Sequence, residues 1–205
     1  MIYDISRRLA VDTVVWPGDA PVELTKNASI SAGESVNLGS ISLSLHSGAH
    51  IDAPFHYSSD GATIDKLTLE PFVGPAHVLH IPNKETITVA DVLYLNFAVA
   101  KRLIIRTDRW KEGESFPAKI PLVSHELIKY LGEAGVLLLG VDVPSVDQIT
   151  SKDLPNHNAL GAWGIQILES LNLVGVPEGI YELIALPLKI IGADGSPVRA
   201  ILRAL

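Results

Sequence analysis

Apolar residues along the chain follow mainly the patterns of β-strands. In ISLSL, residues 41 to 45, branched or apolar residues alternate with serine, which is typical of a half-buried strand. Four further stretches are rich in Val, Ile and Leu and predict strands, several of them buried on both faces: PAHVLHI at 75 to 81, RLIIRTD at 102 to 108, GVLLLGVD at 135 to 142 and YELIALPL at 181 to 188. The pattern therefore predicts a mostly buried β-sheet.

Helical patterns are fewer and shorter. SHELIKYLGEAG predicts a helix with Ser124 as its N-cap and either Gly132 or Gly135 at its end. A second helix is predicted to begin near Asn156, and TVADVLYL predicts a shorter one. Strands separated by helices are typical of an α/β fold, so we expect a central sheet with flanking helices.

Composition narrows the class of protein. The 205 residues, 47% of them hydrophobic, can bury the core of one compact domain, which we expect to span residues 1–205. The formal net charge of −7 argues against a nucleic-acid partner. The first residues lack a signal-peptide pattern, and no apolar run approaches the ~20 residues of a membrane helix. We therefore expect a soluble, cytoplasmic protein.

The stretch HSGAHIDAPFHY concentrates groups that can bind a metal ion. They occupy even positions: His46, His50, Asp52 and His56. On a straight strand they would share one face, but the first and last would lie roughly 33 Å apart. The chain must therefore bend, and Gly48 and Pro54 allow it to do so. Because the chain has no cysteine, a transition-metal site must use His, Asp and Glu, and this segment predicts one.

The same stretch matches the HxGxHxDxPxH segment of the cyclase-like metal-dependent hydrolases, and the chain resembles their bacterial kynurenine formamidase branch. The resemblance continues through YDISRRL, VWPGDAP, GVDVPSVD, PNHNAL, ILESL, VPEGIYELIALPL and SPVRAILRAL. VWPGDAP in a chain of this length separates the formamidases from longer relatives such as isatin hydrolase. The resemblance implies a swivelling β/β/α-type fold, a homodimer, and hydrolysis of N-formyl-L-kynurenine to L-kynurenine and formate in tryptophan degradation.

The resemblance also implies a metal centre. His46, His50 and Asp52 would bind one ion, and His157 would bind a second. Asp52 and Glu169 would bridge the two ions. The implied cofactors are two divalent metal ions per subunit. His and carboxylate ligands suit zinc, manganese and other divalent ions, and we expect Zn²⁺, with Mn²⁺ as the alternative.

The remaining implied roles concern proton transfer and the substrate. His56 would not bind metal but would donate and accept protons, and Trp16 would line the substrate pocket, within or across subunits. Phe55 and Tyr57 flank the loop and are also expected to line this pocket.

Spacing adds a constraint on the second metal. One continuous helix would separate His157 from Glu169 by about 18 Å, too far for a shared ion. We therefore predict a break near Gly161 and Gly164, after which IQILE returns as a strand or a separate turn. One unbroken helix through both residues would contradict the assignment.

Two alternative functions stay open. The chain could be another amide or lactam hydrolase of this superfamily, such as an isatin hydrolase. It could also be a metal-binding module without turnover, although the intact His56 argues against that. Outside the motif, three histidines are predicted to be ordinary core or surface residues: His77, His80 and His125. Three polar residues could either belong to the site or end a strand: Asp142, Ser145 and Asp147.

Overall fold

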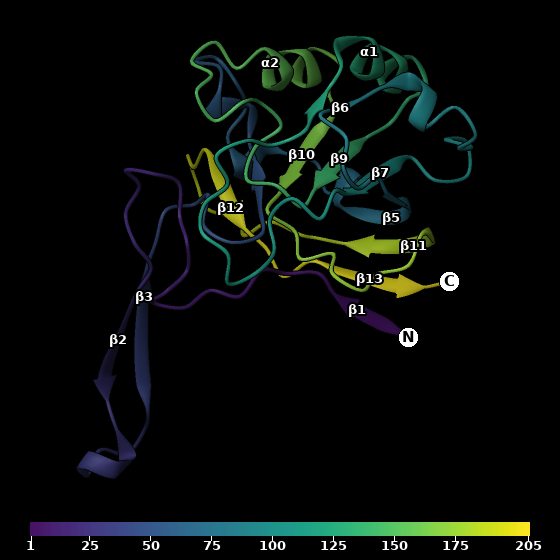
Figure 1. Ribbon diagram of the computed structural model, residues 1–205. Helices are drawn as coiled ribbons and strands as arrows, with labels where there is room; N and C mark the ends of the chain where they lie inside the picture. Colours follow the sequence, from purple (N-terminus) through teal and green to yellow (C-terminus); the bar gives the residue numbers. More distant parts are fainter.

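The computed structural model describes residues 1–205 and is built around one strongly curled, nine-stranded sheet (Figure 1). Its strands follow the order β1 (Ile2–Asp4), β13 (Ile201–Ala204), β11 (Gly179–Ile184), β5 (Val73–His80), β7 (Arg102–Arg106), β9 (Leu138–Val141), β10 (Gln166–Glu169), β4 (His50–Asp52) and β12 (Gly195–Pro197). Two smaller ribbons pair β2 (Glu23–Ala28) with β3 (Leu38–Ser42), and β6 (Thr86–Ile87) with β8 (Leu122–Val123). Both chain ends lie at one edge of the large sheet, where β1 pairs with β13 (Figure 1).

The centre of the sheet is parallel and buried on both faces. β5, β7, β9 and β10 run parallel, and every junction outside them is antiparallel. Along β7, Ile104 faces one hydrophobic cluster, whereas Leu103 and Ile105 face another. The first cluster is enclosed by the curled sheet, and the second lies beneath the helices. The predicted α/β fold with a mostly buried sheet is confirmed.

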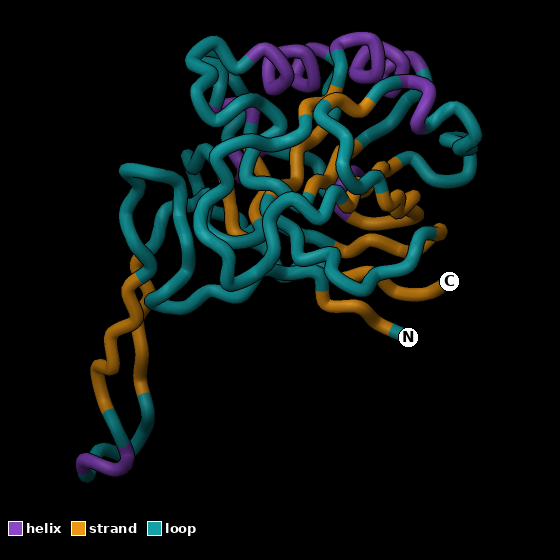
Figure 2. The backbone as a smooth tube through the Cα atoms, viewed as in Figure 1, coloured by secondary structure: helices purple, strands orange, loops and turns teal.

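The two α-helices lie side by side on the same side of the sheet (Figure 2). α1 (His125–Glu133) begins as predicted, because the Ser124 hydroxyl accepts a hydrogen bond from the Leu127 N–H at 3.2 Å. It ends before Gly135, whose φ of +72° suits the left-handed residue that terminates a helix. The second helix, α2 (Pro155–Ala162), is also found. Neither helix is long and apolar enough to cross a membrane.

Short 3-10 turns complete the secondary structure. The predicted helix in TVADVLYL is wrong as a helix, since only the turn η5 (Val89–Asp91) forms there. Its capping box explains the pattern: Thr88 and Asp91 exchange side-chain and backbone hydrogen bonds. The other such turns are η1 (Ile30–Ala32), η2 (Pro54–His56), η3 (Ile64–Lys66) and η4 (Glu70–Phe72).

β2 and β3 form a hairpin arm, residues 23–42, that projects from the body (Figure 1). The predicted half-buried strand at 41 to 45 is wrong in two respects. β3 ends at Ser42, and all five of its residues are exposed. The reason is topological: β3 pairs only with β2, so no layer covers either face of the ribbon.

Candidate metal centre and pocket

β4 supplies the middle of the site. His50 and Asp52 point to one side of the strand while Ile51, between them, enters the core. The antiparallel register places Glu169 of β10 directly opposite His50, so their side chains share a face. His50 Nε2 lies 3.4 Å from Asp52 Oδ1 and 3.5 Å from Glu169 Oε2, and all three residues are buried.

Turns on either side of β4 bring in two more histidines. Gly48 has a φ of +66°, which makes the predicted bend before the strand. It returns His46 so that Nδ1 lies 2.9 Å from Asp52 Oδ1. After the strand, the turn that begins at Pro54 carries His56 back, and the His46 and His56 rings lie 4.0 Å apart. Both predicted bends are confirmed.

α2 supplies the remaining histidine. His157 Nε2 lies 3.4 Å from Asp52 Oδ2 and 3.7 Å from Glu169 Oε1. The predicted chain break is confirmed, because α2 ends at Ala162 and Gly164 has a φ of +69° before β10 begins. IQILE therefore returns to the site as a strand.

Hydrogen bonds fix which nitrogen each buried histidine presents. His50 Nδ1–H donates to the Gly48 carbonyl at 2.9 Å, and His157 Nδ1 lies 2.7 Å from Asp147 Oδ2. In both rings Nε2 therefore faces the carboxylates. Asp147 also accepts the backbone N–H groups of Asn156 and His157, so it holds the start of α2 as well as the ring. Such support of the far ring nitrogen is common for metal-binding histidines.

The electrostatics of the cluster favour a cation. Burial favours the neutral acid form of Asp52, yet the surrounding rings of His157, His46 and His50 hold its pKa well below the ordinary value. Burial and the Asp52 carboxylate raise the pKa of Glu169. Burial disfavours charged imidazoles, but the carboxylates raise the pKa of both His50 and His157 to about 10. The cluster thus attracts positive charge in the absence of metal.

The surroundings of one Asp52 oxygen indicate that a metal ion fits the cluster. Asp52 Oδ2 is fully buried and has no hydrogen-bond partner. An unsatisfied buried carboxylate oxygen is costly, and a coordinated ion would satisfy it. Donor atoms of His50, Asp52 and Glu169 all lie within 4.8 Å of one another, as do those of His46, Asp52 and His56. These His, Asp and Glu groups can hold a metal ion.

An open pocket of about 370 Å³ lies over the cluster. Trp16 of the same chain lines it together with Phe116 and Trp110, which form a row of edge-on aromatic contacts at 5.2 Å and 5.7 Å. The expectation that Phe55 and Tyr57 line the pocket is wrong. Phe55 is 42% exposed and lies outside the pocket lining, and Tyr57 packs between the His157 ring and Gly161.

Two residues beside His46 were not predicted from the sequence. Asp194 Oδ2 lies 3.1 Å from His46 Nε2 and 3.6 Å from His56 Nδ1. Gly195 pairs with Asp52 across the sheet and leaves space for the His46 ring, which a Cβ would meet at 2.8 Å. Their only signal is the turn-like GADGSP, and the contact is set by the pairing of β12 with β4.

The residues outside the motif fall into two groups. His77, His80 and His125 lie away from the cluster, as predicted: His77 bonds the Asn96 carbonyl, His80 bonds Asp108, and His125 begins α1. Asp142 ties β9 to the end of β7 through Thr107 and Asp108, whereas Ser145 lines the pocket.

Solved structures share this architecture. A potential metal-dependent hydrolase with cyclase activity aligns with a TM-score of 0.83 at 26% identity, covering 98% of this chain and 96% of that chain. Isatin hydrolase A from Labrenzia aggregata aligns with a TM-score of 0.82 at 26% identity, covering 98% of this chain and 93% of that one. The curled sheet and the buried donor set therefore define a metal-dependent hydrolase of the cyclase-like fold.

The chain belongs to the cyclase family, because the family model described as putative cyclase matches residues 3–148. Within the curated relatives, a kynurenine formamidase of Geobacillus thermodenitrificans is 45% identical over 202 residues. That match covers 98% of this chain and 97% of the relative.

Proposed function

We propose that the protein is an arylformamidase that hydrolyses N-formyl-L-kynurenine to L-kynurenine and formate in tryptophan degradation. The observation that carries the proposal is the 45% identity to a kynurenine formamidase over nearly the whole length of both chains. The pocket is consistent with it, because aromatic side chains stand beside the polar cluster and match an aryl formamide.

We further propose that two divalent metal ions bind in the cluster, with Zn²⁺ preferred and Mn²⁺ able to replace it. His46, His50 and Asp52 would hold one ion, His157 would hold the other, and Asp52 and Glu169 would bridge them. The unpaired Oδ2 of Asp52 and the supported rings of His50 and His157 favour this assignment. Bound metal would supply Lewis acidity to the formyl carbonyl and a more acidic water.

His56 is assigned to proton transfer in this proposal. Its side chain is 32% exposed and lines the pocket, so a substrate nitrogen can reach it. Burial and the neighbouring histidine rings lower the pKa of His56, which keeps the ring neutral and able to accept a proton from water. It can return that proton to the aniline nitrogen, which leaves poorly as an anion. Trp16 and Phe116 would flank the aryl ring.

The function is tested by product analysis. Metal-loaded protein is given N-formyl-L-kynurenine and isatin in separate reactions, and kynurenine, formate and isatinate are quantified. The proposal expects a much higher kcat/KM for formylkynurenine. Preference for isatin would favour the lactam hydrolase alternative, and bound metal without hydrolysis of either would favour a non-catalytic module.

His56→Ala tests the proton-transfer role. We expect kcat to fall by about 10²- to 10⁴-fold while the bound metal is retained, because the group transfers protons and does not bind the ions. Metal content is measured by elemental analysis beside steady-state kinetics. Loss of metal in this variant would instead make His56 a ligand, and unchanged turnover would remove it from the mechanism.

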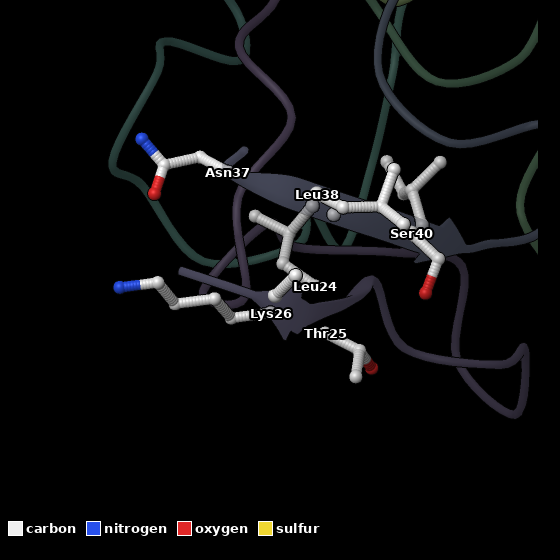
Figure 3. Close-up of a pocket in the computed structure, with 9 residues that line it drawn as sticks. Leu24, Thr25, Lys26, Asn37, Leu38 and Ser40 are labelled. Atoms are coloured by element: carbon white, nitrogen blue, oxygen red, sulfur yellow. The ribbon is translucent and has the colours of Figure 1, made fainter. Parts of the chain in front are cut away.

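A homodimer also belongs to the proposal. The arm has five aliphatic side chains that are each more than half exposed: Leu24, Ile30, Val36, Leu38 and Ile41. Figure 3 shows Leu24 and Leu38 close together on the arm, where both line a shallow pocket. Isolated two-stranded hairpins are marginally stable in water, so the arm gains most by packing on a second copy.

We propose that residues 1–205 act as one domain, because the site combines groups from His46 through Asp194. We also propose a cytoplasmic location and a small-molecule substrate, with neither nucleic acid nor a membrane as partner.

A further inference from the structure

We propose that Asp19 is a specificity-determining residue that binds the α-ammonium group of the amino-acid substrate. The inference rests on the proposed function and adds how the site distinguishes formylkynurenine from other aryl formamides. Asp19 lines the same pocket as the candidate metal centre but lies outside the metal cluster.

A single turn places Asp19 beside the aromatic wall. In Trp16–Pro17–Gly18–Asp19, the Asp19 N–H donates to the Trp16 carbonyl at 2.9 Å, and Gly18 has a φ of +97°. Proline at the second position and left-handed glycine at the third are typical of a type II turn. Trp16 and Asp19 therefore occupy the two ends of one rigid turn, and both face the pocket.

A hydrogen bond orients the Asp19 carboxylate without neutralising it. Ser44 Oγ donates to Asp19 Oδ2 at 2.9 Å, and the same oxygen of Ser44 accepts the His46 N–H at 3.3 Å. Ser44 thus connects the turn to the segment that carries His46. Asp19 itself stays exposed and forms no salt bridge within the chain, so its charge is available to a ligand.

The other carboxylates of the pocket are already engaged. Glu169 faces His50 and His157, and Asp194 faces His46 and His56. None of the residues that line the pocket is a lysine or an arginine. Its histidines surround the metal cluster, so away from that cluster the pocket offers Asp19 to a cation and neither a lysine nor an arginine to a carboxylate.

These features match one end of formylkynurenine. Its formamide lies on the aryl ring, and its α-ammonium lies at the far end of the side chain. With the formamide at the cluster and the ring beside Trp16, the ammonium group would face Asp19 at the other end of the same turn. The structure thus assigns recognition to the α-amino group, not to the α-carboxylate.

Four substrates test this assignment: N-formyl-L-kynurenine, its analogue without the carboxylate, its analogue without the amino group, and formanilide. For the wild-type holoenzyme we expect loss of the carboxylate to change kcat/KM by less than about threefold. Loss of the amino group should lower it about tenfold, the size expected of one charge-assisted hydrogen bond. The reverse order would overturn the inference.

Asp19→Asn keeps an acceptor for Ser44 but removes the charge. We expect KM for the two ammonium substrates to rise about tenfold with kcat little changed, and the effect on formanilide to be at least about fivefold smaller. Asp60→Asn, which alters an exposed carboxylate outside the pocket, serves as the matched control. An equal loss on all four substrates would make Asp19 structural and overturn the proposal. Hydrolysis of none of the four by metal-loaded wild-type protein would instead overturn the formamidase function itself.

Discussion

β3 and β4 are neighbours in the chain with opposite surroundings. β3 leaves Leu38 and Ile41 more than half exposed, at 55% and 51%, whereas β4 buries His50 and Asp52 to 2% exposure each. Exposed apolar surface and buried polar groups both raise the free energy of an isolated chain. Exposed apolar residues in β3 and buried polar residues in β4 therefore each indicate a binding partner, which an ordinary apolar core does not.

The difference between the two strands points to two kinds of missing partner. Buried imidazoles and carboxylates surround an Asp52 oxygen that makes no hydrogen bond, an arrangement that a bound cation would stabilise. Exposed aliphatic residues on an arm without a covering layer call for protein surface. Substitutions in the two regions should consequently affect different measurements.

The largest effect is expected for Asp52→Asn in β4. Asp52 faces three histidines and would bridge both ions, so the variant should lose metal and activity should fall by more than about a thousandfold. Metal content and steady-state hydrolysis measure this, with Asp60→Asn as the exposed control. An Asp52→Asn protein that keeps its metal and turnover would refute the assigned centre.

Replacing one glycine beside β4 and one in β3 by alanine tests the difference between the two regions. In Gly195→Ala the new Cβ would lie 2.8 Å from His46 Cε1 and 3.0 Å from the Ile51 carbonyl, so His46 must move. We expect kcat/KM to fall about 10²-fold. In Gly39→Ala on the arm the nearest atom is the Thr25 carbonyl oxygen at 3.5 Å, and activity should persist. Equal effects of the two changes would show that His46 is not held by this close approach.

Asp147→Asn changes the residue that contacts His157 Nδ1, the ring nitrogen that faces away from the cluster. The amide keeps an acceptor for the backbone N–H groups at the start of α2 but removes the charge beside His157 Nδ1. We expect metal affinity to fall about 10- to 100-fold with the fold intact. Competition with a chelating dye measures the affinity, and unchanged binding would limit Asp147 to supporting α2.

Substitutions in the hairpin arm are expected to have the smallest effect on the stability of the rest of the domain. Leu24→Asp combined with Ile41→Asp should convert the proposed dimer to a monomer, because both side chains lie on the exposed ribbon. The stability of the body should change by no more than about 0.5 kcal/mol. Light scattering after gel filtration gives the mass, with Leu93→Asp as an equally exposed control on the body. A variant that stays dimeric would place the interface elsewhere.

The sequence pattern correctly predicted the strands, caps and bends that depend mainly on residues close together in the chain. The Val- and Ile-rich runs became β5, β7 and β9, Ser124 became the N-cap of α1, and Gly48 and Pro54 turned the chain at β4. The break between His157 and Glu169 followed from helix geometry once the family resemblance had assigned both residues to one metal centre.

What the sequence could not reveal depends on the contacts between distant segments. ISLSL alternates like a half-buried strand, but burial depends on whether another layer covers it. Asp194 and Gly195 reach His46 only because β12 pairs with β4. The roles of the motif histidines came from family resemblance, since spacing alone does not separate a ligand from a proton donor.

The most direct test of the central claim is a metal titration of stripped protein. Hydrolysis of N-formyl-L-kynurenine is measured at each step together with the bound Zn²⁺ per subunit. We predict that stripped protein is inactive and that activity rises with occupancy until two ions are bound. Full hydrolysis by the metal-free protein would contradict the account.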